Sequence, residues 1–206
     1  MLKIWGRATS SNVMKVVWAC EEMRLNYQRI DIGGSFGGNR EPKYLAINPN
    51  GLVPTIEDDG FVLWESNAIV RYLTAKHGAG GLWPNDLKVR ADADRWMDWV
   101  NGVATPPMGA MLFGYYRTPV EKRDPAALEA ARMKAIEAWT MAEAILAKRP
   151  FLAGDKLSIG DIAIGPHVHR WFSYPIERPN LPGLAAYYGR LKERPAYAKH
   201  IAFPVS

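Results

Sequence analysis

The hydrophobic period of this chain changes once along its length, and that change limits the folds open to it. Before residue 77, short runs with the strand period of two alternate with helical segments. After residue 88, apolar residues recur only at helical spacing, and the segment between the two parts is rich in glycine and proline. We therefore predict a mixed α/β domain over 1–76, a linker over 77–88 and an all-helical domain over 89–206.

The first domain is expected to hold a small sheet. Asp59-Gly60 separates two short apolar runs and is a strong signal for a two-residue hairpin. The first two strands are separated by a helix, with Val13, Val16 and Cys20 on one face. A strand–helix–strand order implies a parallel pair with a right-handed crossover, and the hairpin adds antiparallel strands. The result is a mixed four-stranded sheet with helices, and the expected strands cover 2–5, 27–32, 55–58 and 61–64.

Helix-start signals support the helical assignment of the second domain. Asp124 and Pro125 have the identities typical of an N-cap and a first helical position. Ser158 followed three residues later by Asp161 predicts a capping box. The last helix is expected over 183–194, with Pro195 as the signal that ends it.

Charge and composition argue against several classes of partner. The net charge is +5 and the pI is about 9.3, but Lys and Arg are scattered among Asp and Glu, so nucleic-acid binding is not expected. No apolar run is long enough to cross a bilayer, and residues 1–7 do not read as a secretion signal. The single cysteine, Cys20, cannot form an internal disulfide. These features predict a cytoplasmic protein with no membrane partner.

Several apparent motifs do not support a site. The segment "GGSFGGN" over 33–39 fits neither a phosphate-binding loop, because Asn39 stands where lysine is required, nor the dinucleotide pattern, so we interpret it as a flexible loop. His167 and His169 are two residues apart on an expected helix and point to different faces, so no metal site is expected. Cys20 lies on an apolar helix face and is expected to be buried and inert.

An acid–serine pair stands where the last strand ends and a helix begins. The N-terminus of a helix attracts a carboxylate, and the hydroxyl of Ser66 can add to this or cap the helix. Glu65 would attract an ammonium group, so the pair suits the end of an α-amino acid; a simple cap beside a solvated acid is the alternative. Pro54 at a strand start leaves the backbone edge of Val53 open to an extended peptide.

Three segments together resemble one family. "NPNGLVPTIEDDGFVLWESNAIVRYL" (48–73) resembles the glutathione-binding segment of the glutathione S-transferase family. "GRATSSNVMKVVWACEEM" (6–23) resembles its first strand-to-helix turn, and "LSIGDIAIG" (157–165) resembles the capping-box helix of its C-terminal domain. The resemblance covers nearly the whole chain and is to cytosolic, bacterial-like members with a serine-type active site of the theta, zeta or delta kind. It implies a thioredoxin-like first domain, an all-helical second domain and a homodimer.

The resemblance also implies how glutathione is held. Val53-Pro54 would be a cis peptide, with the Val53 backbone pairing with the cysteinyl part of glutathione and Glu65 and Ser66 holding the γ-glutamyl end. Some relatives have histidine at the glycine end, where this chain has Asn39 and Gly51, and some have arginine at the position of Asn67. The glutathione-binding residues implied are Asn39, Lys43, Val53, Pro54, Glu65, Ser66 and Asn67.

The residue that activates the thiol is expected just after the first strand. Family members use Tyr, Ser or Cys there, and no Tyr precedes Tyr27 and no Cys precedes Cys20. Ser10 falls at the serine position of the family, Ser11 is the second candidate, and Asn12 is a further donor. A hydrogen bond to a charged group contributes about 1.5–3 kcal/mol, or roughly one to two pK units. Such a bond favours the thiolate near neutral pH, although either serine would also serve as a helix cap.

The function implied is that of a glutathione transferase whose bound thiolate attacks an apolar electrophile. Glutathione would be a co-substrate, with no permanently bound cofactor. Two alternatives stay open, a glutathione-dependent peroxidase or disulfide-bond reductase and a non-catalytic glutathione-binding module. The expected walls of the electrophile pocket, which are also compatible with ordinary core packing, are Met108, Met111, Phe113, Tyr115 and Tyr116.

Overall fold

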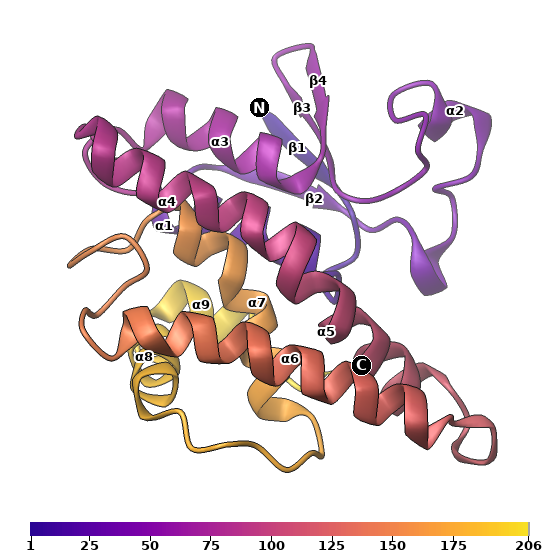
Figure 1. Cartoon of the computed structure of the whole chain (residues 1–206). Helices are drawn as coiled ribbons and strands as arrows, with labels where there is room; N and C mark the ends of the chain where they lie inside the picture. Colours follow the sequence, from indigo (N-terminus) through magenta and orange to yellow (C-terminus); the bar gives the residue numbers. More distant parts are fainter. Residues whose placement is uncertain (206) are drawn as a thin grey trace. The chain divides into compact units, whose positions relative to one another are not determined.

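A computed structural model describes residues 1–205 of the chain (Figure 1). The chain divides into two compact units, the first covering Met1–Trp83 and the second beginning at Pro84. The first unit contains the four strands of the sheet, and the second is built from helices. Each unit is described by itself below.

The first unit contains the predicted mixed sheet. Its strands are β1 (Leu2–Trp5), β2 (Tyr27–Ile30), β3 (Thr55–Asp58) and β4 (Phe61–Trp64). The strand order is β2-β1-β3-β4, with β1 and β2 parallel and the other two pairs antiparallel. Asp59 and Gly60 both have positive φ, 49° and 88°, which is the conformation of a type I′ hairpin turn. The four-stranded sheet and its hairpin are therefore confirmed.

Three helices and a short 3-10 turn complete the first unit. They are α1 (Ser11–Glu22), η1 (Gly34–Phe36), α2 (Pro42–Leu45) and α3 (Ser66–His77). Helices α1 and α3 pack against each other, and α2 lies in the connection between β2 and β3, to one side of the sheet (Figure 1). The glycine-rich segment 33–39 forms a turn around η1, in which four glycines have positive φ. Glycine is used there because other residues rarely adopt that conformation.

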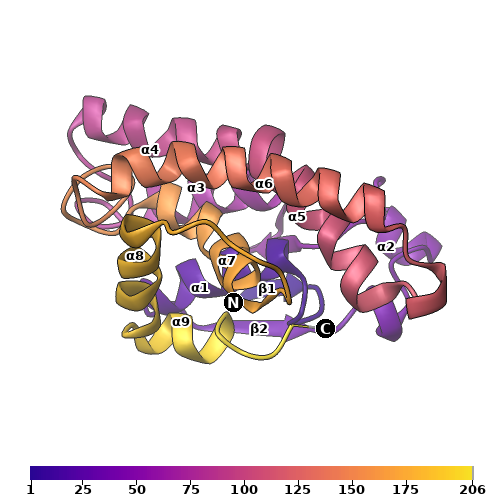
Figure 2. The same ribbon diagram turned by 60° about the horizontal axis from the view of Figure 1, so that its bottom comes forward.

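The second unit is helical, as predicted. Its helices are α4 (Leu87–Trp99), η2 (Val100–Ala104), α5 (Thr105–Leu112), η3 (Phe113–Arg117), η4 (Val120–Lys122), α6 (Pro125–Leu146), α7 (Ile159–Ser173), α8 (Pro182–Lys192) and α9 (Pro195–His200). Helix α7 packs against α4 and α8, and α9 lies beside α8 (Figure 2). The π-helical turns η2 and η3 have no counterpart in the sequence prediction.

One helix boundary was wrong. The helix expected over 183–194 is α8, but it is not the last helix, because α9 follows directly. Pro195 was predicted to end this helix, whereas it occupies the first position of α9. Proline lacks the N–H group that has no partner at a helix start, so it ends one helix and begins the next equally well.

The caps of the second unit are as predicted. Asp124 caps α6 by accepting hydrogen bonds from two backbone N–H groups of its first turn. Ser158 and Asp161 form the capping box of α7, and the buried Asp161 carboxylate also accepts hydrogen bonds from Leu152 N and the Tyr187 hydroxyl. These bonds tie the start of α7 to the preceding loop and to α8.

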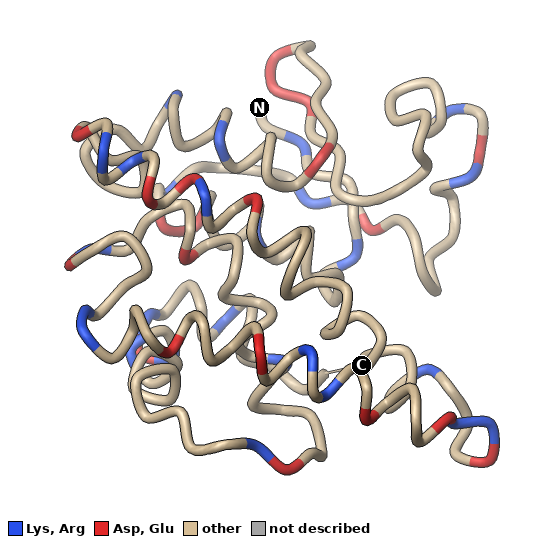
Figure 3. The backbone as a smooth tube through the Cα atoms, in the orientation of Figure 1, with Lys and Arg blue, Asp and Glu red and all other residues tan. Residues whose placement is uncertain are grey.

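The distribution of charge agrees with the mixed pattern of the sequence. Lys and Arg are interspersed with Asp and Glu along the backbone of both units (Figure 3). None of the helices within residues 1–205 is long and apolar enough to span a membrane.

Candidate functional site

The loop before β3 has the geometry that the resemblance implied. The Val53-Pro54 peptide is cis, which confirms that expectation. Neither the N–H nor the C=O of Val53 makes a hydrogen bond within the described part of the chain. The backbone edge of Val53 therefore has one donor and one acceptor left for an extended ligand.

A buried hydrogen-bond network holds this loop in place. The side chain of Asn48 donates to Leu52 O at 2.8 Å and to Thr55 Oγ1 at 3.0 Å. The Tyr44 hydroxyl donates to Leu52 O at 2.7 Å and lies 2.8 Å from Thr55 Oγ1. Since Asn48, Tyr44 and Thr55 are all buried, these bonds form in a low-dielectric environment and position Val53 firmly.

Glu65 and Ser66 occupy the junction between β4 and α3. Ser66 is the first residue of α3 and is only 5% exposed, whereas Glu65 is the N-cap residue and is exposed. The Glu65 carboxylate makes no capping hydrogen bond to the start of α3. Its backbone has φ 74° and ψ 109°, a conformation that is rare outside glycine and that concentrates at functional sites.

A small cavity joins these features. It has a volume of about 40 Å³, more than the roughly 10–15 Å³ that one water molecule needs, so it has room for a polar end group of a ligand. Glu65 is the one ionisable residue in the lining, and the remaining residues offer carboxamides, a hydroxyl, an indole N–H and backbone groups. The lining residues are Asn12, Asn48, Asn50, Leu52, Val53, Pro54, Trp64, Glu65 and Ser66.

Some predicted site residues line this cavity and others do not. Asn12, Val53, Pro54, Glu65 and Ser66 come together from separate segments of the chain. The remaining predicted residues of the first unit are not part of the lining, and these are Ser10, Ser11, Asn39, Lys43 and Asn67.

Ser10 stands at the start of α1. It is the N-cap residue by position, and its C=O accepts from Met14 N at 2.9 Å. Its hydroxyl, however, makes no capping hydrogen bond, although the residue is 9% exposed. Ser11 is the first helical residue and is half-buried, and Asn12 follows it. The hydroxyl of Ser10 is therefore not used to cap α1.

The residues predicted to contact the glycyl end of glutathione differ in what they contact in the structure. Asn39 Nδ2 donates to Gly51 O at 2.7 Å, so this amide fastens one loop to another. Lys43 is exposed on α2. The guanidinium of Arg40, which sequence reasoning did not select, donates to Asn50 O at 3.1 Å. Because Asn50 lines the cavity, Arg40 is a cation at its edge.

Four lining residues were missed by the sequence prediction. Asn48, Asn50 and Leu52 lie within five residues of Val53, and Trp64 directly precedes Glu65. Their closeness in sequence to predicted residues was the available signal. Their types gave none, because asparagine before a turn is ordinarily a turn residue and Trp64 ends a strand.

Asn67 is buried one residue after Ser66. Its Oδ1 accepts a hydrogen bond from Lys15 Nζ at 3.3 Å, and the Lys15 side chain is fully buried in α1. This contact links the first turn of α3 to α1. It places a positively charged group near the N-terminal end of α3.

The residues predicted as electrophile walls differ in accessibility. Met108 and Met111 are fully buried in α5, and the backbone C=O of Met108 accepts from the Tyr174 hydroxyl at 2.8 Å. Phe113, by contrast, is 58% exposed, Tyr116 is 38% exposed and Tyr115 is half-buried. The accessible members of this set all lie on η3.

The cysteine and the two neighbouring histidines, which were not expected to form a site, are held by contacts within the helices. Cys20 is fully buried in α1, and burial raises the pKa of its thiol to about 12, which keeps it protonated and unreactive. His167 lies 3.2 Å from the Thr105 hydroxyl, whereas His169 contacts Tyr188 and the carbonyl of Phe203. The two histidines therefore face different elements, as expected.

Comparison with known proteins gives consistent matches to one family. The model described as "Glutathione S-transferase, N-terminal domain" matches residues 1–75, and the model "Glutathione S-transferase, C-terminal domain" matches residues 125–190. The chain is 42% identical to glutathione S-transferase GstB of Escherichia coli over the full length of both chains. It is also 30% identical to disulfide-bond oxidoreductase YfcG of Escherichia coli, over 92% of this chain and 89% of that protein.

Solved structures with the same fold include a ligand complex. The theta class glutathione S-transferase of Xanthomonas axonopodis pv. citri with glutathione bound has a TM-score of 0.96 and 45% identity to this chain, covering 100% of this chain and 99% of that one. The apo form of that enzyme has a TM-score of 0.87 over 100% and 98% of the two chains, at 40% identity.

Proposed function

Because this chain belongs to the glutathione S-transferase family, we propose that its first unit binds glutathione at the cavity beside Glu65 and that its second unit binds the electrophile. Glutathione is the co-substrate of this transferase, and the peroxidase, reductase and non-catalytic alternatives are not favoured by the relatives found. We assign glutathione binding to a domain over 1–76, followed by a linker over 77–88 and a domain over 89–206 that supplies the electrophile pocket.

The γ-glutamyl end of glutathione binds at the start of α3. Its carboxylate accepts hydrogen bonds from the Ser66 hydroxyl and from N–H groups of the first helical turn, where the helix dipole also favours a negative charge. Its ammonium group pairs with the exposed carboxylate of Glu65. The support for this placement is that Glu65 and Ser66 line one cavity whose size fits an end group.

The middle of glutathione extends along the loop before β3. The N–H and C=O of Val53 are unpaired within the described residues, and they bond the cysteinyl residue as a neighbouring strand would. Pro54 shapes the loop, and we assign the glycyl carboxylate to the neighbourhood of Arg40, Asn39 and Lys43. Arg40 is the favoured partner of that carboxylate, because the Asn39 amide already binds Gly51.

The Ser10 hydroxyl activates the thiol by donating a hydrogen bond to the thiolate. The observation that carries this assignment is that Ser10 stands at the N-cap of α1 without using its hydroxyl as a cap. The N-terminus of α1 adds a positive partial charge, which also stabilises the thiolate. Ser11 and Asn12 are the further donors, and Asn67 supports the first turn of α3.

The activated thiolate then attacks an electrophilic carbon of an apolar second substrate. The new bond forms between sulfur and carbon, and the leaving group departs with the bonding electrons. Phe113, Tyr115 and Tyr116 supply accessible aromatic surface for this substrate, while Met108 and Met111 support them from within the core. We further propose that the protein is a cytoplasmic homodimer.

Titration of bound glutathione against pH, followed by ultraviolet difference absorbance of the thiolate, tests this function. For the wild type we expect a bound-thiol pKa below the value of about 8.5 for a free thiol. In Ser10→Ala we expect that pKa to rise by roughly one to two units, with a matching loss in kcat. Ser35→Ala, in the exposed turn η1, is the matched control and should leave both values unchanged. A wild-type pKa equal to that of free glutathione would contradict thiol activation.

A further inference from the structure

The aromatic surface assigned above to the electrophile is built around η3 and lies wholly within the helical unit. The ring of Tyr174, at the end of α7, lies 6.3 Å from that of Tyr115 and 5.8 Å from that of Tyr116, centroid to centroid. Tyr174 is itself fixed, because it is buried and its hydroxyl donates to Met108 O at 2.8 Å. Phe113, with 58% of its surface exposed, is the most accessible ring of this cluster.

Arg117 adds a positive charge to this surface. Its guanidinium carbon lies over the Phe113 ring, 4.8 Å from the ring centre, which is the geometry of a cation–π contact. Arg117 is also near Tyr174: burial raises the pKa of that hydroxyl, and the charges of Arg170 and Arg117 act in the opposite direction. The guanidinium is exposed, and its N–H groups make no hydrogen bond or ion pair within residues 1–205. All of its donors are therefore available to a ligand.

Two further guanidinium groups border the tyrosines. Arg123 Nη2 donates to Tyr115 O at 2.6 Å, and Arg123 Nε donates to Thr118 O at 3.2 Å. Arg178 donates to the carbonyl of Tyr174. Neither arginine forms an ion pair in the described part of the chain. Backbone carbonyls hold these two side chains in place, but they carry no net charge and so do not neutralise them.

The acids of the same segments do not neutralise the arginines. The carboxylate of Asp124 accepts from two backbone N–H groups as the cap of α6. Glu121 and Glu177 are exposed, and neither is in an ion pair among the residues that the structure describes. Over residues 113–124, three cations outnumber two acids. The potential at the aromatic surface is therefore positive.

The position of Arg117 on the Phe113 ring is what points to a charged ligand. An exposed guanidinium that stands alone can remain hydrated, so its charge by itself indicates nothing. A ligand that covers the Phe113 ring, however, must remove water from the guanidinium above it. A wholly apolar ligand would not compensate for that water, whereas an anionic group would replace it with charge-assisted hydrogen bonds.

We propose that the second substrate is a planar electrophile that carries one anionic group, such as a carboxylate, and that Arg117 binds this group. The inference rests on the proposed function and defines the chemical class of the electrophile. For an aryl halide, the thiolate sulfur bonds to the ring carbon that carries the halogen. The carbon–halogen bond then breaks and its electron pair leaves with the halide. The anionic group takes no part in the bond changes and serves only in recognition.

Initial-rate kinetics with 4-chloro-3-nitrobenzoate and with its methyl ester tests the proposal. The two compounds share the chlorine and its activating nitro group and differ by one charge. In Arg117→Met, which keeps an unbranched stem beside Phe113, we expect KM for the benzoate to rise about tenfold with little change in kcat. Both constants for the ester should stay unchanged. Arg117→Lys keeps the charge, so it should raise KM for the benzoate less than Arg117→Met does.

A matched control separates a local contact from an effect of net charge. Lys156→Met removes an exposed cation in the turn before α7 and should leave KM for both compounds unchanged. Added salt should raise the wild-type KM for the benzoate, because salt screens an exposed charge pair, and it should have little effect on that KM in Arg117→Met.

A binding measurement makes the test independent of turnover. The compound 3-nitrobenzoate has no halide to displace, so it reports recognition alone. Calorimetric titration in the presence of glutathione should show saturable binding to the wild type and about tenfold weaker binding to Arg117→Met. If this difference is found but neither chlorinated compound is turned over, the proposed transferase function is contradicted while the role of Arg117 is supported.

Two results would overturn the proposal. The first is an equal rise in KM for the benzoate and the ester in Arg117→Met, or no rise for either. The second is binding of 3-nitrobenzoate that is the same in the wild type and Arg117→Met, or that is absent from both. A wild type that turns over the ester and gives either result keeps the proposed transferase function without a preference for an anionic electrophile.

Discussion

Glu65 is the residue whose local structure most directly suggests a ligand. Its φ of 74° is unfavourable for a non-glycine residue, with a cost of order 1–3 kcal/mol, and its carboxylate makes no capping bond to offset that cost. A glycine at this position would adopt the same backbone without strain. The presence of an acid there is consistent with a charge needed by the ligand rather than by the helix.

Replacing Glu65 with glutamine removes the charge and keeps the size. We expect glutathione to bind roughly 10- to 100-fold more weakly, because a charge-assisted hydrogen bond contributes about 1.5–3 kcal/mol. An analogue of glutathione without the α-amino group should bind wild type and Glu65→Gln equally. Isothermal titration with both ligands measures this, and Glu57→Gln, a β3 residue paired with Lys3, is the control. Equal weakening for both ligands would contradict an ammonium partner.

Arg40 is predicted to recognise the glycyl carboxylate of glutathione. Arg40→Met should raise KM for glutathione about tenfold, as expected for the loss of one charge-assisted bond at an exposed site. It should leave KM for γ-glutamylcysteine, which lacks the glycine, unchanged. Steady-state kinetics with the two thiols measures the difference in KM. Lys88→Met, which removes an exposed cation on α4, is the control and should leave both KM values unchanged. A similar loss for both thiols would mean that Arg40 acts only by holding Asn50.

At the scale of elements, α7 organises the helical unit. Its residues are almost all buried, its start is tied by the Asp161 capping box, and its middle carries His169. His169 Nε2 donates to the carbonyl of Phe203 at 2.7 Å, and the Tyr188 hydroxyl lies 2.9 Å from Nδ1. One neutral imidazole therefore connects α7 to α8 and to the C-terminal segment.

The free energy of unfolding is predicted to depend on pH through His169. Burial lowers the pKa of this imidazole, an effect partly opposed by its bond to the Phe203 carbonyl. The unfolded chain therefore binds a proton more readily than the folded protein, so His169 contributes stability above a pH of about 6.5, and that stability is lost as the pH falls toward the lower folded-state pKa.

Urea unfolding at pH 7.5 and pH 5.5 checks this prediction. We expect the difference in unfolding free energy between the two pH values to be smaller in His169→Gln than in the wild type. His77→Gln, at the exposed end of α3, is the control and should retain the wild-type difference. A His169→Gln variant with the full wild-type difference would show that another group is responsible.

At the scale of the whole molecule, the open question is how many chains assemble. The chain has a mass of 23.1 kDa, and a homodimer would have twice that mass in light scattering. We expect the measured mass to stay at that of the dimer across micromolar concentrations, because permanent homodimers bury large apolar surfaces at their interface. Sedimentation velocity provides an independent measurement. A mass of one chain in both experiments would rule out the homodimer.

The sequence by itself determined the elements of the fold. Strand periods, the Asp59-Gly60 turn and the caps at Asp124 and Ser158 each depend on residues within a few positions of one another, and local sterics and hydrogen bonds decide them. The predicted strands, their hairpin and the two caps were confirmed for this reason. The error at Pro195 was also local, since proline carries the same signal at a helix stop and at a helix start.

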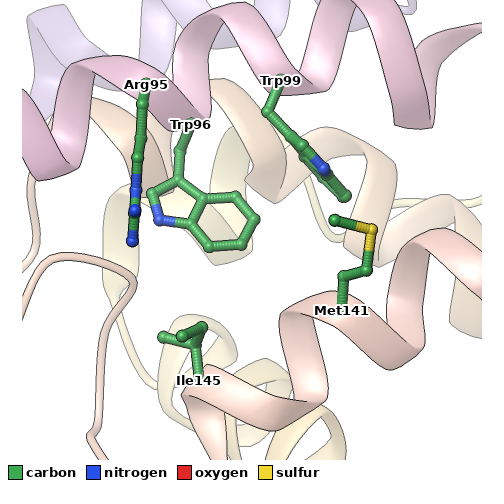
Figure 4. Close-up of a pocket in the computed structure, with 5 residues that line it drawn as sticks. All are labelled: Arg95, Trp96, Trp99, Met141 and Ile145. Atoms are coloured by element: carbon green, nitrogen blue, oxygen red, sulfur yellow. The ribbon is translucent and has the colours of Figure 1, made fainter.

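Only the tertiary structure decided which side chains share a site. The network of Asn48, Tyr44 and Thr55 and the cavity that brings Asn12 to Glu65 depend on contacts between segments far apart in the sequence. The same holds for a cavity between α4 and α6 that Trp96 and Ile145 help to line, because no motif marks either residue (Figure 4). Periodicity indicates which face of a helix or strand is apolar. Which other segment packs against that face is decided by the tertiary structure, because burial and the pairing of hydrogen-bond donors are properties of the assembled core.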